Sequence, residues 1–300
     1  MRLIAYRHIA YIISGTLVLL SLLVFFFWGL KLGIDFTGGT LIEIEYRVAP
    51  PSIDTLNARS QAAGIPHVII QPTGERGVLI RTEHLSEGEH QALLQSLRGG
   101  DGESLVEKRF DTIGPTIGKE LARKSVWAIA LVIILIVLYI AWAFRKVSEP
   151  VSSWKYGVAT VIALVHDVTI PVGIFSVLGH FYGIEVDTLF VTALLTILGF
   201  SVHDTIVVFD RIRENLKNAK GKLSFETVVG ESISQTLTRS VNTSMTVLFV
   251  LLAIYFFGGA SVEYFALALI VGIAFGTYSS ICLASPILVT WQQWSDREEK

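Results

Sequence analysis

The sequence predicts a helical membrane protein: six transmembrane helices, with a small α+β domain of ferredoxin-like type between the first two. Composition carries the membrane assignment, because 52% of the 300 residues are hydrophobic and only 17% are charged. Soluble domains average about 25% charged residues. Mean hydropathy is correspondingly high, at +0.58. The inserted domain is predicted by one long polar stretch that follows the first apolar segment.

Six apolar segments are long enough to cross a bilayer, which takes roughly 20 helical residues. The first follows Arg2 and Arg7, as a signal peptide would. Its apolar run exceeds the roughly 7–15 residues of a signal core, and no small-residue cleavage site follows, so we interpret it as an uncleaved span. The predicted spans are Ile12–Leu30, Val126–Phe144, Tyr156–Leu178, Thr188–Phe209, Val241–Phe257 and Phe265–Val289.

The basic residues gather on one side of these spans. The short loops on the other side, His180–Asp187 and Gly258–Glu263, contain no Lys or Arg. Because loops rich in Lys and Arg stay in the cytoplasm, we expect both termini there and the inserted domain outside. The residues that set this orientation are Arg2, Arg7, Arg145, Lys146, Lys155, Arg211, Arg213, Lys217, Lys220, Lys222, Arg297 and Lys300.

Four parts are expected along the chain. Residues 1–30 hold the N-terminus and the first span, and residues 31–124 form the external domain. Residues 125–290 form a five-helix membrane domain that includes a charged cytoplasmic segment at 210–238. The remaining residues, 291–300, form a cytoplasmic tail.

The external domain has its own alternation of strands and helices. Ser52 and Ser86 are each expected to cap a helix, the second with Glu89 in a capping box. The order β-α-β-β-α-β is that of the ferredoxin-like split βαβ fold. The predicted elements are strand Gly39–Val48, helix Ser52–Ala63, strand His67–Gln71, turn Pro72–Gly77, strand Val78–Thr82, helix Ser86–Leu97 with Gly99–Gly100 as terminator, and strand Leu105–Phe110.

The segment GIDFTGG, at residues 33–39, joins the first span to this domain. Its glycines Gly33, Gly38 and Gly39 miss the spacings of dinucleotide and phosphate-binding loops, and no helix is expected after them. We interpret the segment as a tight turn in which Asp35 caps or bonds the backbone.

The sequence contains no recognisable pattern of catalytic or metal-binding residues. The histidines of the external domain, His67, His84 and His90, lack metal-ligand spacing, and the single cysteine, Cys282, lies in an apolar segment. We therefore expect no metal, no cofactor, no enzymatic activity and no nucleic-acid partner.

Two acidic residues lie inside predicted spans, each directly after a histidine. Asp167 follows His166 near mid-bilayer in the third span, and Asp204 follows His203 nearer the cytoplasmic end of the fourth. A carboxylate at bilayer depth costs about 2.5–3.5 kcal/mol on insertion scales, which makes it a functional candidate. Arg239 opens the fifth span at about the depth of Asp204.

Several interpretations of these residues stay open. Asp204 and Arg239 are expected to pair, either as a structural ion pair or as a protonation switch. His203 is a proton relay partner or a helix-facing hydrogen bonder. Asp167 has a relay or conformational role, or bonds a neighbouring helix. Pro171, four residues later, is expected to kink that span.

A charged patch follows Asp204 where the fourth span leaves the membrane. It contains Asp210, Arg211 and Arg213. Its basic residues suit anionic lipid head groups, although positive-inside anchoring already accounts for them.

Three motifs resemble the SecF family of bacterial protein-export accessory subunits. They are GIDFTGG at 33–39, GFSVHDTIVVFDRIREN at 199–215 and LTRSVNTS at 237–244. The resemblance covers the whole chain. It implies a six-span half of the resistance-nodulation-division type, in the bacterial cytoplasmic (inner) membrane, with SecD as a separate chain that supplies the other half.

The resemblance also implies a function. SecD and SecF together are thought to use the proton-motive force to promote translocation of a polypeptide, with the SecYEG channel, the motor SecA and YajC-like accessory proteins as partners. Asp204 matches the family's essential transmembrane acid and Arg239 its partner, while His203 stands where many members have Asn.

Two alternatives belong to other functional classes. The chain could be half of a small-molecule or lipid exporter of the same superfamily, although such pumps usually carry both halves and large external domains in one chain. It could also be a passive assembly factor with no transport cycle.

Overall fold

The structure is a computed structural model that describes residues 2–98, 105–144 and 152–298. It divides into two compact units. The membrane unit consists of Met1–Lys31 and Trp127–Lys300, and the insert unit of Leu32–Val126. The predictions for Gly99–Gly100, Arg145, Lys146 and Lys300 lie outside the described residues.

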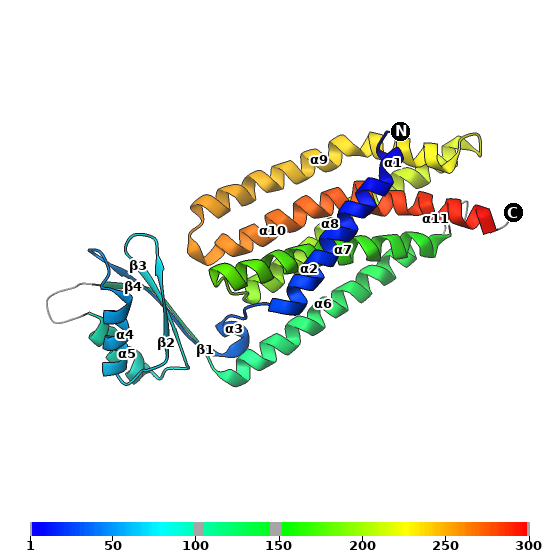
Figure 1. Cartoon of the computed structure of the whole chain (residues 1–300). Helices are drawn as coiled ribbons and strands as arrows, with labels where there is room; N and C mark the ends of the chain where they lie inside the picture. The colour runs from blue at the N-terminus through cyan, green and yellow to red at the C-terminus, as the bar shows by residue number, and fades with distance from the viewer. Residues whose placement is uncertain (1, 99–104, 145–151, 299–300) are drawn as a thin grey trace. The chain divides into compact units, whose positions relative to one another are not determined.

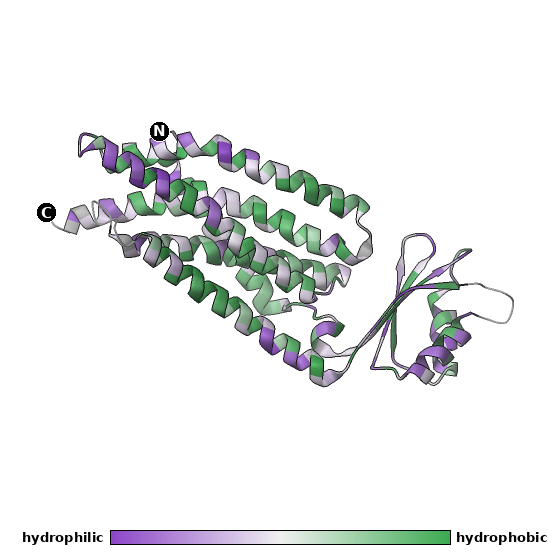
Figure 2. Ribbon diagram, turned by 180° about the vertical axis from the view of Figure 1, so that it is seen from behind, coloured by the Kyte–Doolittle hydropathy of each residue, from purple (hydrophilic) through white to green (hydrophobic). Residues whose placement is uncertain are grey.

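The membrane unit is built from long helices, which Figure 1 labels. Among the described residues, six helical segments are long and apolar enough to cross a membrane, as predicted. Figure 2 shows their mainly hydrophobic character. The helices are α1 (Arg2–Ala5), α2 (Arg7–Trp28), α6 (Pro115–Ala143), α7 (Ser153–Tyr182), α8 (Thr188–Ala219), α9 (Phe225–Phe257), α10 (Ala260–Ser279), the π-helix η1 (Ser280–Ala284) and α11 (Ser285–Glu298), of which the last three form one span.

Local capping signals explain several of these boundaries. Asp187 caps α8 by accepting a hydrogen bond from the backbone N–H of Phe190, and Ser224 caps α9 in the same way. Gly183 ends α7 in the left-handed conformation, at φ 70°. The segment 210–238 is the two ends of α8 and α9 with a short turn between them.

Helix α10 lies at the centre of the membrane unit, where it packs against α7, α8 and α9. Gly272 permits this close approach, because a Cβ atom there would overlap the side chain of Ile197 on α8. Gly276, one turn later, brings α10 close to Ser201 in the same way. Small residues four apart let membrane helices approach closely. Gly272 and Gly276 form this pattern in the sequence.

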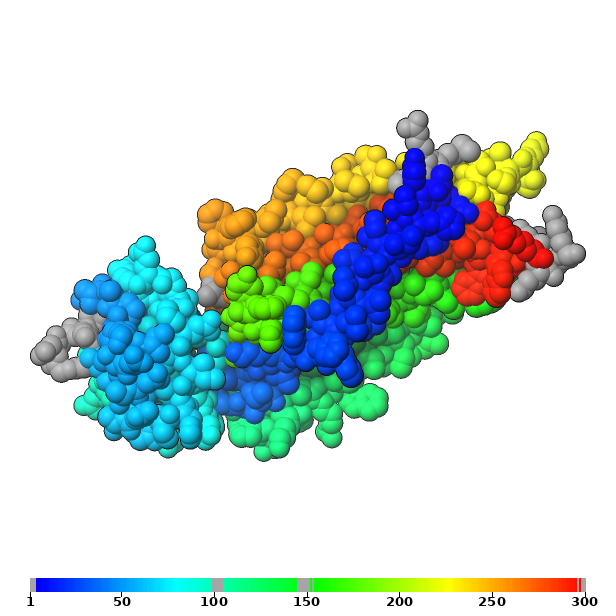
Figure 3. Space-filling model, in the orientation of Figure 1, coloured from blue at the N-terminus to red at the C-terminus, as the bar shows by residue number. Residues whose placement is uncertain are grey.

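Helix α2 lies on the outside of the unit and packs against α7. Figure 3 shows it, in blue, crossing the face of the molecule. Gly173 of α7 makes room for Ser21 of α2, since a Cβ atom on Gly173 would overlap that serine. Large apolar side chains of α2 remain exposed, among them Phe26 at 82%, as a lipid-facing helix requires.

The insert unit has the predicted β-α-β-β-α-β order. Its sheet is antiparallel throughout, with strand order β2-β3-β1-β4. This places β3 between β1 and β2, as a split βαβ arrangement requires. The elements are β1 (Gly39–Tyr46), α4 (Ile53–Ala62), β2 (Val68–Thr73), β3 (Gly77–Thr82), α5 (Glu87–Leu97) and β4 (Leu105–Ile113).

The alternation in β1 places Ile42, Ile44 and Tyr46 in the core of the insert unit, as the pattern indicates. The predicted capping box of α5 is also present. There the backbone N–H and hydroxyl of Ser86 donate to Glu89, which holds the pKa of that carboxyl below its usual range. Strand β2 runs two residues past its predicted end, through Pro72. A proline is tolerated there because β2 is an edge strand.

The GIDFTGG segment forms one helical turn, α3 (Ile34–Thr37), where the sequence predicted only a tight turn. Gly33 is its N-cap, so Asp35 stands inside the turn and does not cap it. Gly38 and Gly39 follow at φ 77° and 132°, which favour glycine. A Cβ on Gly38 would lie 2.7 Å from the Cα of Pro115. These glycines therefore let β1 start directly against the first turn of α6.

Candidate functional site

The first buried carboxylate lies in the middle of α7. Asp167 has no exposed surface. Nδ1 of His166 lies 2.8 Å from its Oδ1, and the hydroxyl of Ser279, at the end of α10, donates to Oδ2 at 2.7 Å. Ser201 of α8 donates to the same oxygen. Three helices therefore meet at Asp167, and all its acceptor atoms are occupied.

The second buried carboxylate, Asp204 on α8, is held by hydroxyls alone. It is 7% exposed. Ser240 of α9 donates to Oδ1 at 2.5 Å, and Ser280, the first residue of η1, donates to Oδ2 at 2.8 Å. Within the described part of the chain, no basic side chain contacts this carboxyl.

The last span reaches both acids through a tandem pair of serines. Ser279 contacts Asp167, and its neighbour Ser280 contacts Asp204. Adjacent residues on a helix point about 100° apart, so these two neighbouring serines can reach two different carboxyls from the same level of the span. A π-helical turn starts at Ser280, and such turns are frequent at functional sites.

Pro286 lies two residues after the end of the wide turn. Proline has no backbone N–H, so it cannot donate to the carbonyl four residues earlier, that of Cys282. The hydroxyl of Ser285 donates to a different carbonyl, that of Ser280, at 3.0 Å. The serine that holds Asp204 therefore also accepts a side-chain hydrogen bond at its own backbone carbonyl.

The expected ion pair between Asp204 and Arg239 is not formed in this structure. Arg239 is exposed, and it makes no ion pair or hydrogen bond among the described residues. The face of α9 that turns inward carries Thr236, Ser240 and Ser244 at a spacing of four. Arg239 lies one residue off that face. The sequence therefore predicted the depth of the contact to Asp204 but not the side chain that makes it.

A polar stripe of α9 lies on its exposed side. Asn242, Thr243 and Thr246 are exposed together with Arg239. On the neighbouring helix α8, His203 is also exposed and does not contact Asp204. The histidine that contacts a buried acid is His166, beside Asp167. From the sequence it was known only as the residue that precedes Asp167.

The charged patch after Asp204 ties α8 to α9. Asp210 pairs with Arg213 at 2.6 Å, and Arg211 donates to Glu214 and, across to α9, to Gln235, both at 2.6 Å. These contacts are on the surface, where such pairs contribute at most about 1 kcal/mol. Of the three, the contact from Arg211 to Gln235 joins the two helices that carry Asp204 and Ser240.

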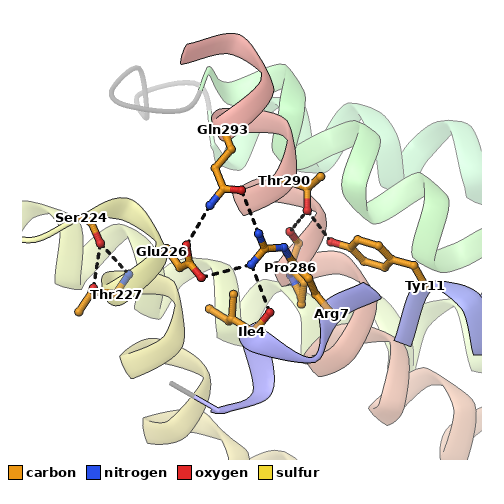
Figure 4. A network of polar contacts seen from close by, with 9 residues as sticks. All are labelled: Ile4, Arg7, Tyr11, Ser224, Glu226, Thr227, Pro286, Thr290 and Gln293. Atoms are coloured by element: carbon orange, nitrogen blue, oxygen red, sulfur yellow. Dashed lines mark hydrogen bonds and ion pairs between the residues drawn. The ribbon is translucent and has the colours of Figure 1, made fainter. Parts of the chain in front are cut away.

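The N-terminal end of α2 is attached to this assembly by a polar cluster, which Figure 4 shows. Arg7 donates to Glu226 of α9 at 3.2 Å and to Gln293 of α11 at 2.9 Å. Gln293 in turn donates to Glu226 at 2.9 Å. Tyr11 bonds Thr290 one turn away, at 2.9 Å. The first span is therefore fastened to α9 and to the last span.

Sequence reasoning missed Ser240, Ser279 and Ser280. A signal was present, because two consecutive serines inside an apolar span are polar groups that need partners. Their small hydroxyls did not stand out beside the charged residues.

Comparison with known proteins adds the family. Residues 94–294 match the model "Protein export membrane protein SecD/SecF, C-terminal", and residues 24–49 match the SecD/SecF GG motif. The protein translocase subunit SecF of Thermobaculum terrenum is 45% identical over 97% of this chain and 93% of its own length. This chain belongs to the SecF family. The SecF of Vibrio alginolyticus is 38% identical, over 94% of this chain and 87% of that protein.

Solved structures agree with this SecF assignment. The crystal structure of SecDF from Thermus thermophilus, titled a translocon-associated membrane protein, matches 98% of this chain with a TM-score of 0.83 and 36% identity. This chain spans only 39% of that SecDF chain. A SecDF structure in a super-membrane-facing form matches with a TM-score of 0.68. The SecF-family chain is thus a multi-pass protein of the cytoplasmic membrane and a subunit of the protein translocase.

Proposed function

We propose that this chain is the proton-responsive SecF half of a unit that uses the proton-motive force to promote protein translocation. SecD, as a separate chain, supplies the other half, and SecYEG, SecA and YajC-like proteins are the remaining partners. Both termini face the cytoplasm, and the insert unit faces outward, where it acts on the emerging polypeptide. The SecF and SecDF relatives support this assignment.

One observation carries the proposal: Asp204 is buried, yet hydroxyl groups alone hold it. A carboxylate at bilayer depth without a cation is costly, whereas a protonated carboxyl carries no charge to neutralise. The hydroxyl of Ser280 also lies 3.0 Å from the carbonyl of Thr277, so it can donate there while a protonated Asp204 donates to its oxygen. The serine-held arrangement therefore suits the protonated acid. When the proton leaves, the charged carboxylate requires a cation, and Arg239 is the nearest basic residue along α9.

The two partners of Asp204 lie next to each other in the sequence. Ser240 contacts the carboxyl, and Arg239 precedes it on the same helix. A rotation of α9 by about 100° exchanges one position for the next. Loss and gain of a proton at Asp204 would then be coupled to the rotation of a whole span.

The exposed polar stripe of α9 supports a partner on that side. The free energy of an arginine at this depth is unfavourable where its side chain faces lipid, and less so where it faces a protein or a water-filled cavity. A second six-span half would cover Arg239, Asn242 and Thr243. The SecDF chain of Thermus thermophilus, of which this chain spans 39%, is long enough to contain such a half.

The transmembrane potential supplies enough free energy to shift an equilibrium between two orientations of α9. One charge that crosses a potential of 100 mV gains about 2.3 kcal/mol. This corresponds to a shift of about fifty-fold in a two-state equilibrium. A single proton therefore biases a rotation, and a long movement of the insert unit requires several.

The test is Asp204→Asn in a complex reconstituted with SecD, SecYEG and SecA. Assembly should be retained, and the increase in translocation caused by a proton gradient should be abolished. Asp210→Asn is the matched control, because Asp210 is an exposed acid on the same helix and pairs with Arg213 on the surface. Full proton-driven translocation by Asp204→Asn would overturn the proposal and favour a passive assembly factor.

A further inference from the structure

A pocket of about 740 Å³ lies between α2, α7 and the last span, away from the exposed stripe of α9. Its wall is almost entirely apolar and includes Gly15 and Val18 of α2, Val165 of α7, and Leu283 and Trp291 of the last span. Gly15 leaves it open on the α2 side, because a Cβ atom there would meet nothing within 4 Å. Figure 3 shows α2, in blue, next to the red C-terminal helix on this face.

A buried cation lies next to this pocket, close to one of the residues that line it. Lys155, in the first turn of α7, is only 8% exposed. Its ammonium donates to the hydroxyl of Ser295 at 2.8 Å and lies 5.9 Å from the ring centroid of Trp291, which lines the pocket. Among the side chains that the structure describes, no carboxylate neutralises it. An ammonium has three donors, so Lys155 retains capacity for an anionic ligand.

Tryptophans mark the depth of this end. Trp154 packs edge-on against Trp291, and Trp294 also lines the pocket. Trp154 and Trp294 have exposed rings. Tryptophan is enriched at the level of lipid head groups. Lys155 is therefore at the membrane surface, where a lipid phosphate lies.

The length of the pocket matches one leaflet. Along the last span its wall runs from Leu283 to Trp294, eleven positions apart, which is about 16 Å at the helical rise. The hydrocarbon core of a bilayer is about 30 Å thick, or roughly 15 Å per leaflet. The pocket therefore extends from the head groups to about the middle of the membrane.

From these features we infer that the pocket between α2, α7 and the last span binds a membrane phospholipid. One acyl chain fills the apolar wall, and the phosphate contacts Lys155. The charge of the phosphate complements the buried ammonium, and such charge-assisted bonds are stronger than neutral ones. The bound chain lies against Leu283, a residue of the π-helical turn that begins at Ser280, the serine that contacts Asp204.

Native mass spectrometry of the full chain tests this inference. The delipidated protein in detergent is titrated with phosphatidylglycerol, and in parallel with diacylglycerol, which has the same chains and no phosphate. We expect one retained phosphatidylglycerol per chain and weaker retention of diacylglycerol. Lys155→Met should reduce the affinity for phosphatidylglycerol about tenfold and leave diacylglycerol unchanged.

A second variant fills the pocket. Gly15→Trp places a large side chain in the open space beside α2 and should abolish retention of both lipids. Gly199→Trp is the matched control, since Gly199 is an exposed helical glycine with equally open surroundings and does not line the pocket. Both variants are compared with the parent chain by circular dichroism, so that a folding defect is recognised.

Crosslinking of the unmodified chain gives an independent measurement. A phosphatidylglycerol with a photoreactive diazirine on its acyl chain, in nanodiscs, should label the peptides that contain Val18, Val165 and Leu283. Equal lipid retention by the Gly15→Trp and Gly199→Trp chains would overturn the inference, as would labels distributed evenly over the exposed spans. Replacement of the lipid by a partner helix in the assembled translocase would also overturn it. None of these readouts depends on proton-driven translocation.

Discussion

The two buried acids of the membrane unit occupy the same sequence context and different surroundings. Each follows a histidine, at His166-Asp167 and His203-Asp204. In α7 the histidine is 2% exposed and bonds its own aspartate; in α8 the histidine is exposed and does not contact its aspartate. The dipeptide therefore does not determine the site, and the packing around each helix does.

The proposed function gives the two acids different roles, a structural node at Asp167 and a switch at Asp204. Asp167 joins α7, α8 and α10, and its histidine partner is buried with it. Asp204 also joins three helices, through Ser240 and Ser280, but an exposed arginine lies directly beside Ser240 on the same helix. We infer that Asp167 keeps its partners, while Asp204 exchanges them. Three measurements test this difference.

Removing the acids should have the largest effect and should differ between them. Asp167→Ala leaves His166 and Ser201 without their buried partner, while Ser279 keeps the carbonyl of Gly276, and should lower the free energy of unfolding by about 2–6 kcal/mol, at about 1–3 for each unsatisfied group. Asp204→Ala leaves Ser240 without its acceptor, while Ser280 keeps the carbonyl of Thr277, for a loss of about 1–3 kcal/mol. Equilibrium unfolding of the purified chain in detergent measures both. Equal losses would remove the distinction between node and switch.

Helix packing beside the node is the next test. Gly272→Ala forces a methyl group into Ile197 where α10 meets α8, and such overpacking costs about 1–3 kcal/mol. Gly199→Ala is the control, because its Cβ would meet nothing within 4 Å. It should be neutral, or stabilising by up to about 1 kcal/mol. Thermal unfolding of the two variants side by side gives the difference, and a tolerated Gly272→Ala would show that this contact can relax.

The histidines should give the smallest effect. His166→Gln loses a buried hydrogen bond to Asp167 and should destabilise the isolated chain by about 1–2 kcal/mol. His203→Gln changes an exposed side chain and should stay within about 0.5 kcal/mol. The same unfolding assay applies to both. A larger effect at His203 than at His166 would reverse the assignment of the two histidines.

Much of the fold was predictable because its signals are local. Long apolar runs predict spans, and the caps at Ser52 and Ser86 predict helix starts in the insert unit. Alternation predicts the inward face of β1. The extent of β2 was not predictable, because tolerance of Pro72 depends on the strand being at the sheet edge, which only the pairing of strands decides.

The candidate site was predictable in part. The cost of charge in a membrane singled out Asp167 and Asp204 from the sequence alone, and both are buried. The partners of Asp204 were not predictable in this way. In a helix rich in apolar, hydroxyl and charged residues, sequence spacing does not say which face turns inward.

The number of spans, the order of elements in the insert unit, the two acids and the family all follow from the amino-acid sequence. Hydrophobicity, capping and motif residues act within short stretches of chain, so they can be recognised without the fold. Helix packing, in contrast, sets the contact of Ser240 rather than Arg239 with Asp204, and the division of the Ser279 and Ser280 hydroxyls between two acids. Those contacts depend on how each helix is rotated against its neighbours, and that rotation is set by packing at places such as Gly272 and the π-helical turn.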